Sequence, residues 1–187
     1  MMLKRSGLFL LFVGCVAVGG CASFSGLAPF RFTPNGKEMP EASVEELAKT
    51  IESQVFAGNR DMNLTAPEGL ILGDAVVQAA RTRAIRADLV KNLLRSGYAV
   101  EQRNGTVALI RNREYRQATS SRERDRNALI IMSENTDRWT IYEGLVRDSK
   151  LKGSSLPAIQ RIFYRARIPL LEPGMKYEDE SGQTVTR

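Results

Sequence analysis

The chain has 187 residues, a formal net charge of +6, two cysteines and no histidine. The lack of histidine excludes Ser-His-Asp and Cys-His nucleophilic systems and histidine-based metal sites. We therefore expect a binding protein rather than an enzyme, with no catalytic residue, no cofactor and no metal.

The first 20 residues have the three zones of a secretory signal. Two basic residues at positions 4 and 5 precede an uncharged run, and small residues lead into Cys21. The apolar run is shorter than the about 20 residues of a transmembrane helix. The sequence Val18-Gly19-Gly20-Cys21 resembles the lipobox of bacterial lipoproteins, whose cysteine is acylated after cleavage. We therefore expect a signal peptide at 1–20 and lipid attachment at Cys21.

Residues 21–40 are small and polar, with three prolines, and predict a tether between membrane and domain. Ala22, rather than aspartate, follows the cysteine. By resemblance to lipoproteins of Gram-negative bacteria, this implies sorting to the outer membrane, facing the periplasm. The other cysteine, Cys15, lies in the signal, so no disulfide is available within residues 21–187. Nucleic acid is a poor candidate partner in that compartment. The basic excess favours solubility, and contact with anionic lipid or an acidic partner is the alternative.

Two helices are predicted first. The pattern Ser43 to Glu46 is a capping box, followed by apolar residues at helical spacing until Gly58. Asp74 is expected to cap a longer helix that ends near Ser96. Its expected apolar face includes Ile85 and Leu89, and its arginines give it a basic side. Core packing is favoured for this helix over a position on the membrane surface.

The remaining elements alternate between hairpins and helices. Residues 98–102 and 106–110 flank an Asn-Gly turn and predict a β-hairpin. The polar run 111–126 fits a linker or the first turns of a helix, which then occupies most of 121–149 with Ser120 or Ser121 as its cap. A further helix opens at Ser154 or Ser155 and ends at 168–169. Residues 175–178 and 183–185 predict a second hairpin. The expected class is α+β, mainly helical, with one domain at 41–187.

Three patterns invite a chemical interpretation. Ser149 and Lys152 fit the Ser-x-x-Lys spacing of acylating enzymes, but the partner motifs of that class are absent. The carboxylates at 178–180 lie in a predicted turn without aromatic sugar platforms. Trp139 and Tyr142 share a helix face, which predicts that Trp139 is largely buried. Alanine at that position is then expected to cost about 3–5 kcal/mol.

Several short motifs follow one another in the second half of the chain: a basic helix ending at Gly97, a hairpin with Glu101 and Asn104-Gly105, a helix with Asn135, Arg138 and Tyr142, and an ending with Pro173-Gly174, Tyr177 and Gly182. With this order of motifs, the region from about 81 to 187 resembles small periplasmic proteins of the YdbL type. The resemblance implies a helical envelope protein without catalytic residues. Such proteins accompany a large AsmA-like bridge and a small outer-membrane lipoprotein in phospholipid traffic between the two membranes. The present chain departs by its own lipobox and by the helix near 43–56.

The sequence thus predicts a lipid-anchored periplasmic accessory protein of the cell envelope. It is expected to assist an AsmA-like bridge in phospholipid transport, or outer-membrane homeostasis, through contacts with another protein. Two alternatives stay open. One is an enzyme of the cell wall or of lipids that uses carboxylates, and the other is a structural lipoprotein that contacts peptidoglycan.

Overall fold

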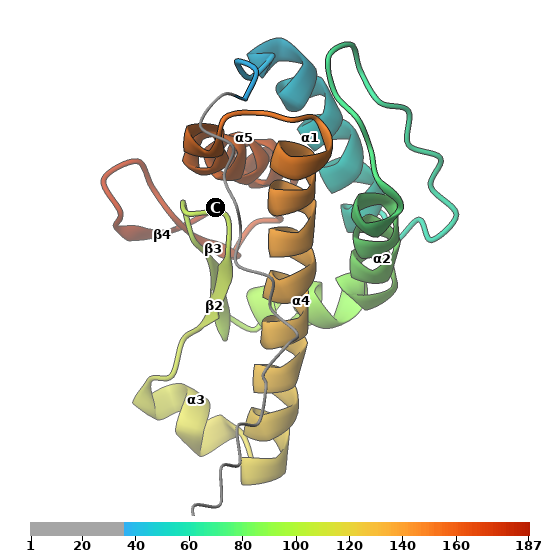
Figure 1. Cartoon of the computed structure of the whole chain (residues 1–187). Coiled ribbons are helices and arrows are strands. Elements are labelled where there is room, and N and C mark those ends of the chain that lie inside the picture. Colours follow the sequence, from blue (N-terminus) through green and yellow to red (C-terminus); the bar gives the residue numbers. More distant parts are fainter. Residues whose placement is uncertain (1–35) are drawn as a thin grey trace, which may run out of the picture. The chain divides into compact units, whose positions relative to one another are not determined.

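A computed structural model describes residues 36–187, and the expected α+β class is confirmed. The structure consists of helices and one small sheet. Figure 1 shows the long helix α4 running through the molecule. The helices are α1 (Glu41–Phe56), α2 (Asp74–Arg95), α3 (Arg113–Ala118), α4 (Ser121–Asp148) and α5 (Leu156–Arg167), with 3-10 turns η1 (Gly153–Ser155) and η2 (Ile168–Leu170). The strands are β1 (Ala99–Glu101), β2 (Val107–Leu109), β3 (Lys176–Glu178) and β4 (Thr184–Thr186).

Helices α2 and α4 form the most extensive helix pair, and α1 packs against both α2 and α5. A glycine sets the distance between α2 and α4. A Cβ atom on Gly144 would lie 2.4 Å from Cγ2 of Val76, which is far inside van der Waals contact. Any larger residue at position 144 would therefore push the two helices apart.

The two predicted hairpins are confirmed, and they join in one sheet. Its strand order is β2-β1-β3-β4, in which β1 and β3 run parallel with Val100 opposite Lys176. Asn135 of α4 covers the free edge of β2. Its side chain accepts from the amide of Val107 and donates to the carbonyl of the same residue, each at 2.9 Å. This pairing protects an edge that is otherwise open to another strand.

Two predicted helix caps are wrong. Helix α1 begins at Glu41, because the amide of Val44 already donates to the carbonyl of Pro40, and Ser43 lies inside the first turn. Asp74 is the first residue of α2, and Gly73 takes the capping position. Close contact explains the glycine, since a Cβ atom there would lie 2.3 Å from a carboxylate oxygen of Asp148. Of the two candidate caps of α4, Ser120 and Ser121, the structure has Ser120, which forms a complete capping box with Glu123.

The start of the polar run 111–126 forms a separate helix, α3, capped by the side chain of Asn112. On α2, the predicted apolar face needs correction at two positions. Ile85 and Leu89 are 56% and 39% exposed, whereas Arg83 is fully buried. The extensive packing of α2 against α4 and α1 supports the core-packing interpretation of this helix.

The described end of the predicted tether lies against the domain. Lys37 forms a parallel bridge with Leu151, in which its amide donates to Lys150 and its carbonyl accepts from Lys152. A Cβ atom on Gly36 would clash with the backbone of Leu151 at 2.4 Å. The chain therefore joins the domain at the C-terminal end of α4.

Two apolar clusters make up the core, and both long helices contribute to each. The first contains residues of α1, α5, the first half of α2 and the second half of α4, including Val76, Ile141 and Phe163. The second contains Val90 and Leu94 of α2, Ile131 of α4 and residues of the sheet. Among residues 36–187, no helix is long and apolar enough to cross a membrane.

Candidate functional site

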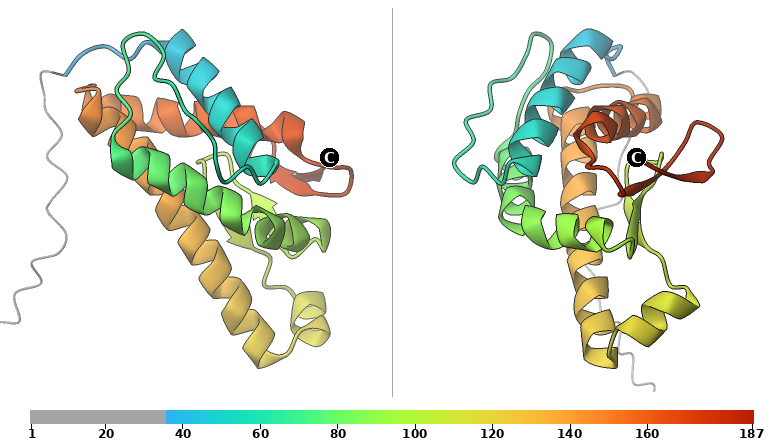
Figure 2. Two further views of the ribbon diagram at one scale, coloured as in Figure 1. Left: turned by 90° about the vertical axis from the view of Figure 1, so that its right-hand side faces the viewer. Right: turned by 180° about the vertical axis from the view of Figure 1, so that it is seen from behind.

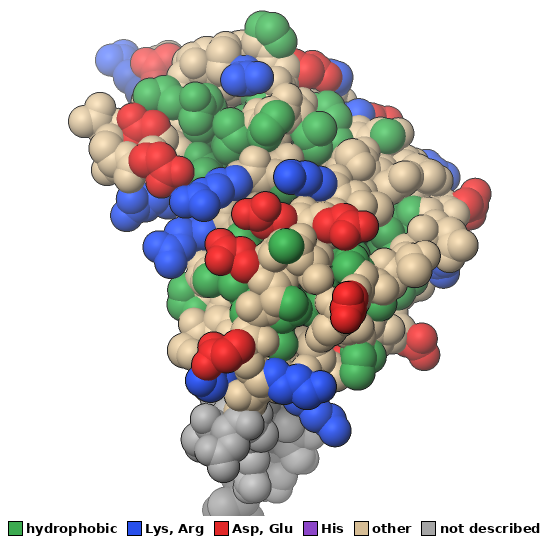
Figure 3. All heavy atoms as spheres, turned by 90° about the horizontal axis from the view of Figure 1, so that it is seen from above, with side chains coloured by type: hydrophobic (Ala, Val, Ile, Leu, Met, Phe, Trp, Pro, Cys, Tyr) green, Lys and Arg blue, Asp and Glu red, His purple; other side chains and the backbone are tan. Residues whose placement is uncertain are grey.

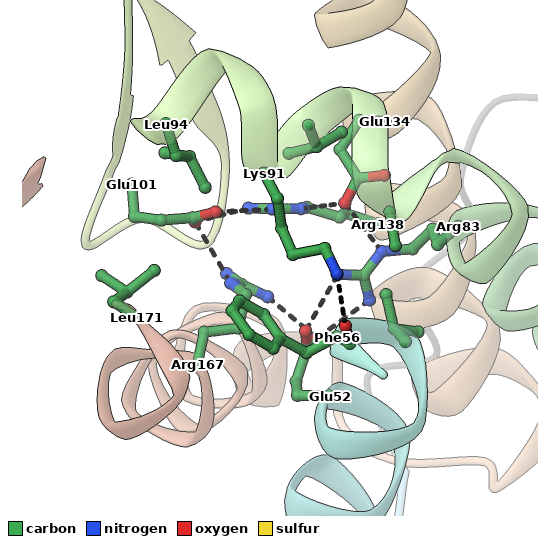
Figure 4. A pocket seen from close by; sticks show the side chains of 13 residues that line it. Glu52, Phe56, Arg83, Lys91, Leu94, Glu101, Glu134, Arg138, Arg167 and Leu171 are labelled. Carbon is green, nitrogen blue, oxygen red and sulfur yellow. Dashed lines mark hydrogen bonds and ion pairs between the residues drawn. The ribbon is translucent and has the colours of Figure 1, made fainter. Parts of the chain in front are cut away.

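Three arginines and three glutamates form a closed ring of ion pairs (Figure 4), and the cavity beside it is lined by residues of both apolar clusters, such as Val55 and Leu94. All six side chains are at most 5% exposed. They come from four helices and one strand, so the tertiary fold alone brings them together. The buried ring consists of Glu52 of α1, Arg83 of α2, Glu101 of β1, Glu134 and Arg138 of α4, and Arg167 of α5.

Charges alternate around the buried ring. Arg83 makes a bidentate pair with Glu52, both bonds 2.9 Å long, and its Nε donates to Glu134 at 2.9 Å. Arg138 binds the same Oε1 of Glu134 at 2.8 Å. Its other two nitrogens grip Glu101 at 2.7 and 2.8 Å. Paired N–H groups directed at a carboxylate are the strongest geometry available to arginine.

Arg167 closes the buried ring. Its Nε donates to Glu101 at 3.2 Å, and its Nη1 donates to Glu52 at 2.9 Å. Nη2 donates to the carbonyl of Gly105, which also accepts from the hydroxyl of Tyr142. Gly105 has a φ of +87°, and Tyr142 atoms lie 3.2 Å from the position a Cβ would take. The tight turn of the first hairpin therefore needs glycine for both its conformation and its space.

The buried ring stays fully charged. Burial by itself would raise the pKa of Glu52, Glu101 and Glu134, but the adjacent guanidinium groups more than offset this and hold all three pKa values below normal. Burial would conversely lower the pKa of Arg83 and Arg138, and their carboxylate partners raise it instead. Every carboxylate is therefore ionised near neutral pH, and every guanidinium is protonated.

A small cavity of about 40 Å³ borders the buried ring. Apolar residues of α1, α2 and the segment after η2 line its other side, among them Val55, Val90 and Leu171. Lys91 and Phe56 also line it. The Lys91 ammonium donates to the carbonyl of Phe56 at 3.1 Å and lies 5.2 Å from the centre of its ring. This volume suffices for a few water molecules, since one needs roughly 10–15 Å³.

The chemistry of the buried ring is structural. A general acid at neutral pH needs a raised pKa, and these carboxyl groups have lowered ones. Each of their oxygens already accepts at least one hydrogen bond from a guanidinium group. In residues 36–187, no group of three or more metal-binding side chains is present. The arrangement fixes how four helices and the sheet meet.

The residues singled out from the sequence do not converge on this centre. Ser149 is buried, accepts from the amide of Ile71 at 2.9 Å and so holds the loop before α2, while Lys152 pairs with Glu38. The carboxylates at 178–180 belong to the second hairpin, where Asp179 accepts from the amides of Ser181 and Gln183. Cys21, the expected lipid attachment site, lies outside the described residues.

The expected burial of Trp139 is wrong. Its side chain is 37% exposed, whereas Tyr142 is completely buried and the two rings meet edge to face at 6.4 Å. The inward stripe of α4 passes through Arg138, one position earlier. Because the buried ring takes a charged side chain into the core at that position, the aromatic residue next to it is turned toward solvent.

The spacing of charged residues within the apolar stripes of α2 and α4 is a sequence signal for the buried ring. On α4, Glu134 and Arg138 continue the spacing of Ile131, Ile141 and Leu145, all of which are buried. On α2, Arg83 likewise falls among buried alanines. Charged residues in register with an apolar stripe, and of both signs on different helices, predict buried ion pairs.

Comparison of the chain with protein-family models, curated proteins and solved structures finds no match.

Proposed function

We propose that this chain is a lipid-anchored accessory protein of the cell envelope, acylated at Cys21, held at the outer membrane facing the periplasm, and active through contact with another protein. The lipobox pattern supports the anchor. The resemblance to YdbL-type proteins over about 81–187 supports an AsmA-like bridge as the partner and phospholipid transport as the process.

The surface around Trp139 is the observation that carries the binding role. Its side chain lies in a shallow hollow on α4 together with Met132, which is 65% exposed, and Thr136. Tryptophan is enriched among the residues that dominate binding energy at protein interfaces. Because the buried ring is satisfied internally, the Trp139 surface is the better candidate for contact with a partner.

Site-specific crosslinking tests this role. A photoreactive phenylalanine derivative in place of Trp139 should crosslink in cells to an AsmA-like bridge protein, identified by mass spectrometry. The same derivative at Glu68, an exposed residue of the loop before α2, is the control. Crosslinks to peptidoglycan would favour a structural lipoprotein instead. Equal products at both positions would overturn the assignment of this surface.

Replacing Trp139 by alanine should leave folding nearly intact. Since the side chain is partly exposed, we expect the free energy of unfolding to fall by no more than about 1 kcal/mol. Phe163, which is completely buried, is the matched control, and its replacement by alanine should cost about 3–5 kcal/mol. Urea denaturation of both variants measures the difference. Equal losses of unfolding free energy in the two variants would show that Trp139 contributes to the core as Phe163 does.

The anchor has its own test. Cys21→Ala removes the thiol that would carry the thioether, so labelling with a radioactive fatty acid should vanish and the precursor should stay uncut or soluble. Persistent labelling would contradict the lipobox assignment. Fractionation of the unaltered protein with the inner membrane would contradict the expected sorting.

A further inference from the structure

The far end of the molecule carries an unusual concentration of arginine. Helix α3 and the first turns of α4 extend away from the rest of the fold, at the end opposite α1 and α5 (Figures 1 and 2). Six arginines against three acidic residues give segment 111–126 a formal charge of +3, half that of the whole chain. The arginine tip consists of Arg111, Arg113, Arg116, Arg122, Arg124 and Arg126.

These arginines are not neutralised within the described part of the chain. None of the six pairs with a carboxylate there, whereas seven arginines elsewhere do. The nearby carboxylate of Glu123 is engaged by Ser120 in the capping box. The opposite end of the molecule differs, because positive and negative side chains are interspersed over it (Figure 3).

Side-chain contacts hold α3, which carries part of the arginine tip, against the rest of the fold. Tyr115 of α3 is buried, meets Tyr98 edge to face at 5.0 Å and accepts from the amide group of Asn127 on α4 at 3.2 Å. Arg124 donates to the carbonyl groups of Arg116 and Thr119, which ties the two helices together. The basic side chains therefore project from a fixed pair of helices.

An exposed apolar residue adjoins the charge. Leu129 is 63% exposed and follows Arg122 and Arg126 at the spacing i, i+4, i+7, so the three share one face of α4. Asp125, three residues after Arg122 and four before Leu129, is an acidic residue on the same face. A membrane surface offers phosphate groups to the arginines and apolar acyl chains to the exposed leucine. A purely acidic protein surface would match only the arginines, so a membrane surface is the better fit.

We propose that the arginine tip binds the head groups of anionic phospholipids, with Leu129 entering the boundary between head groups and acyl chains. One guanidinium group can donate two parallel hydrogen bonds to the oxygens of one phosphate group. The inference goes beyond the proposed function, because it assigns a second membrane contact independent of acylation. The tip and the bridge at Lys37 lie at opposite ends of α4, which at 28 residues is about 42 Å long.

Vesicle binding by the full chain carrying Cys21→Ala tests the proposal without an acyl anchor. Binding to phosphatidylcholine vesicles that contain one third phosphatidylglycerol should be much tighter than to pure phosphatidylcholine. Replacing Arg113, Arg122 and Arg126 together by glutamine should weaken the anionic binding on the order of 100-fold, since each basic residue near such a surface contributes about fivefold. Binding to neutral vesicles should not change.

The matched control replaces three exposed arginines elsewhere, Arg60, Arg161 and Arg187, by glutamine and so has the same net charge. Thermal melts of both triple variants should coincide with that of the parent, and the leader segment common to all three proteins cancels in the comparison. An equal loss of binding in the control would show that binding depends on the net charge of the protein and not on the arginine tip, which would overturn the proposal. Tighter binding of polyglutamate than of anionic vesicles would also overturn it, in favour of an acidic protein. None of these outcomes depends on Cys21 or Trp139, so the proposed function is tested separately.

Discussion

Replacing Arg138 by methionine should lower the free energy of unfolding by about 3–5 kcal/mol, because removal of one partner leaves buried charge uncompensated. Arg138 is the link between Glu134 and Glu101. Without it, Glu101 keeps one hydrogen bond, from Nε of Arg167 at 3.2 Å. A loss of this size is a large fraction of the stability of an ordinary domain, and urea denaturation measures it.

An exposed ion pair provides the control. Arg95 makes a bidentate pair with Glu172, but both side chains are more than a third exposed, so Arg95→Met should lower the free energy of unfolding far less than Arg138→Met does. Adding Glu101→Gln to Arg138→Met should recover part of the loss, since it neutralises the carboxylate left without its partner. A change below about 1 kcal/mol for Arg138→Met alone would show that the buried ring does not stabilise the fold.

Acid should unfold the protein steeply. The three carboxyl groups of the buried ring have lowered pKa values in the folded state, so their contribution is present above the normal glutamate pKa of about 4.3 and is lost as the pH falls below it. Below that value, the unfolded chain binds protons that the folded chain excludes. Each carboxyl then contributes about 1.4 kcal/mol per pH unit, which is roughly 4 kcal/mol per unit for three.

Between about pH 5 and 8 the free energy of unfolding should stay nearly constant, because the chain contains no histidine. Denaturation curves recorded from pH 8 down to pH 3 measure both regimes. Repeating them at high salt is the control, since buried pairs are screened much less than exposed ones. A slope below pH 4 that disappears in salt would assign the acid sensitivity to surface pairs rather than to the buried ring.

The sequence was sufficient for elements that local spacing determines. The hairpin around Asn104-Gly105 and the extent of α4 depend on residues a few positions apart, and the structure has them as predicted, with Ser120 as the cap of the two candidates Ser120 and Ser121. It was insufficient where distant segments meet. The parallel pairing of β1 with β3 joins strands that are separated by three helices, and no local pattern records it.

The interior was mispredicted for one physical reason. We assigned large apolar residues to the core and charged residues to solvent, whereas arginine can be buried when carboxylates surround it. On α4, Trp139 was therefore expected to be buried, whereas Arg138 is the buried residue. On α2, Arg83 was assigned to the basic, solvent-facing side, although its side chain is fully buried. Glu101 and Arg138 pair in the buried ring, and the hydroxyl of Tyr142 joins Arg167 at the carbonyl of Gly105.

The buried ring also determines when the chain is able to fold. Glu52 and Arg167, which are paired in it, lie 115 residues apart. As the chain is synthesised from its N-terminus onward, the three glutamates and the first two arginines emerge before Arg167. Burying them at that stage would set three carboxylates of the buried ring against only two of its guanidinium groups, so hydration of these charges is favoured until α5 is present. The native state is thus expected to become accessible only once α5 has been made, and we expect a chain truncated before residue 167 to be cleaved by proteases more readily than the full chain.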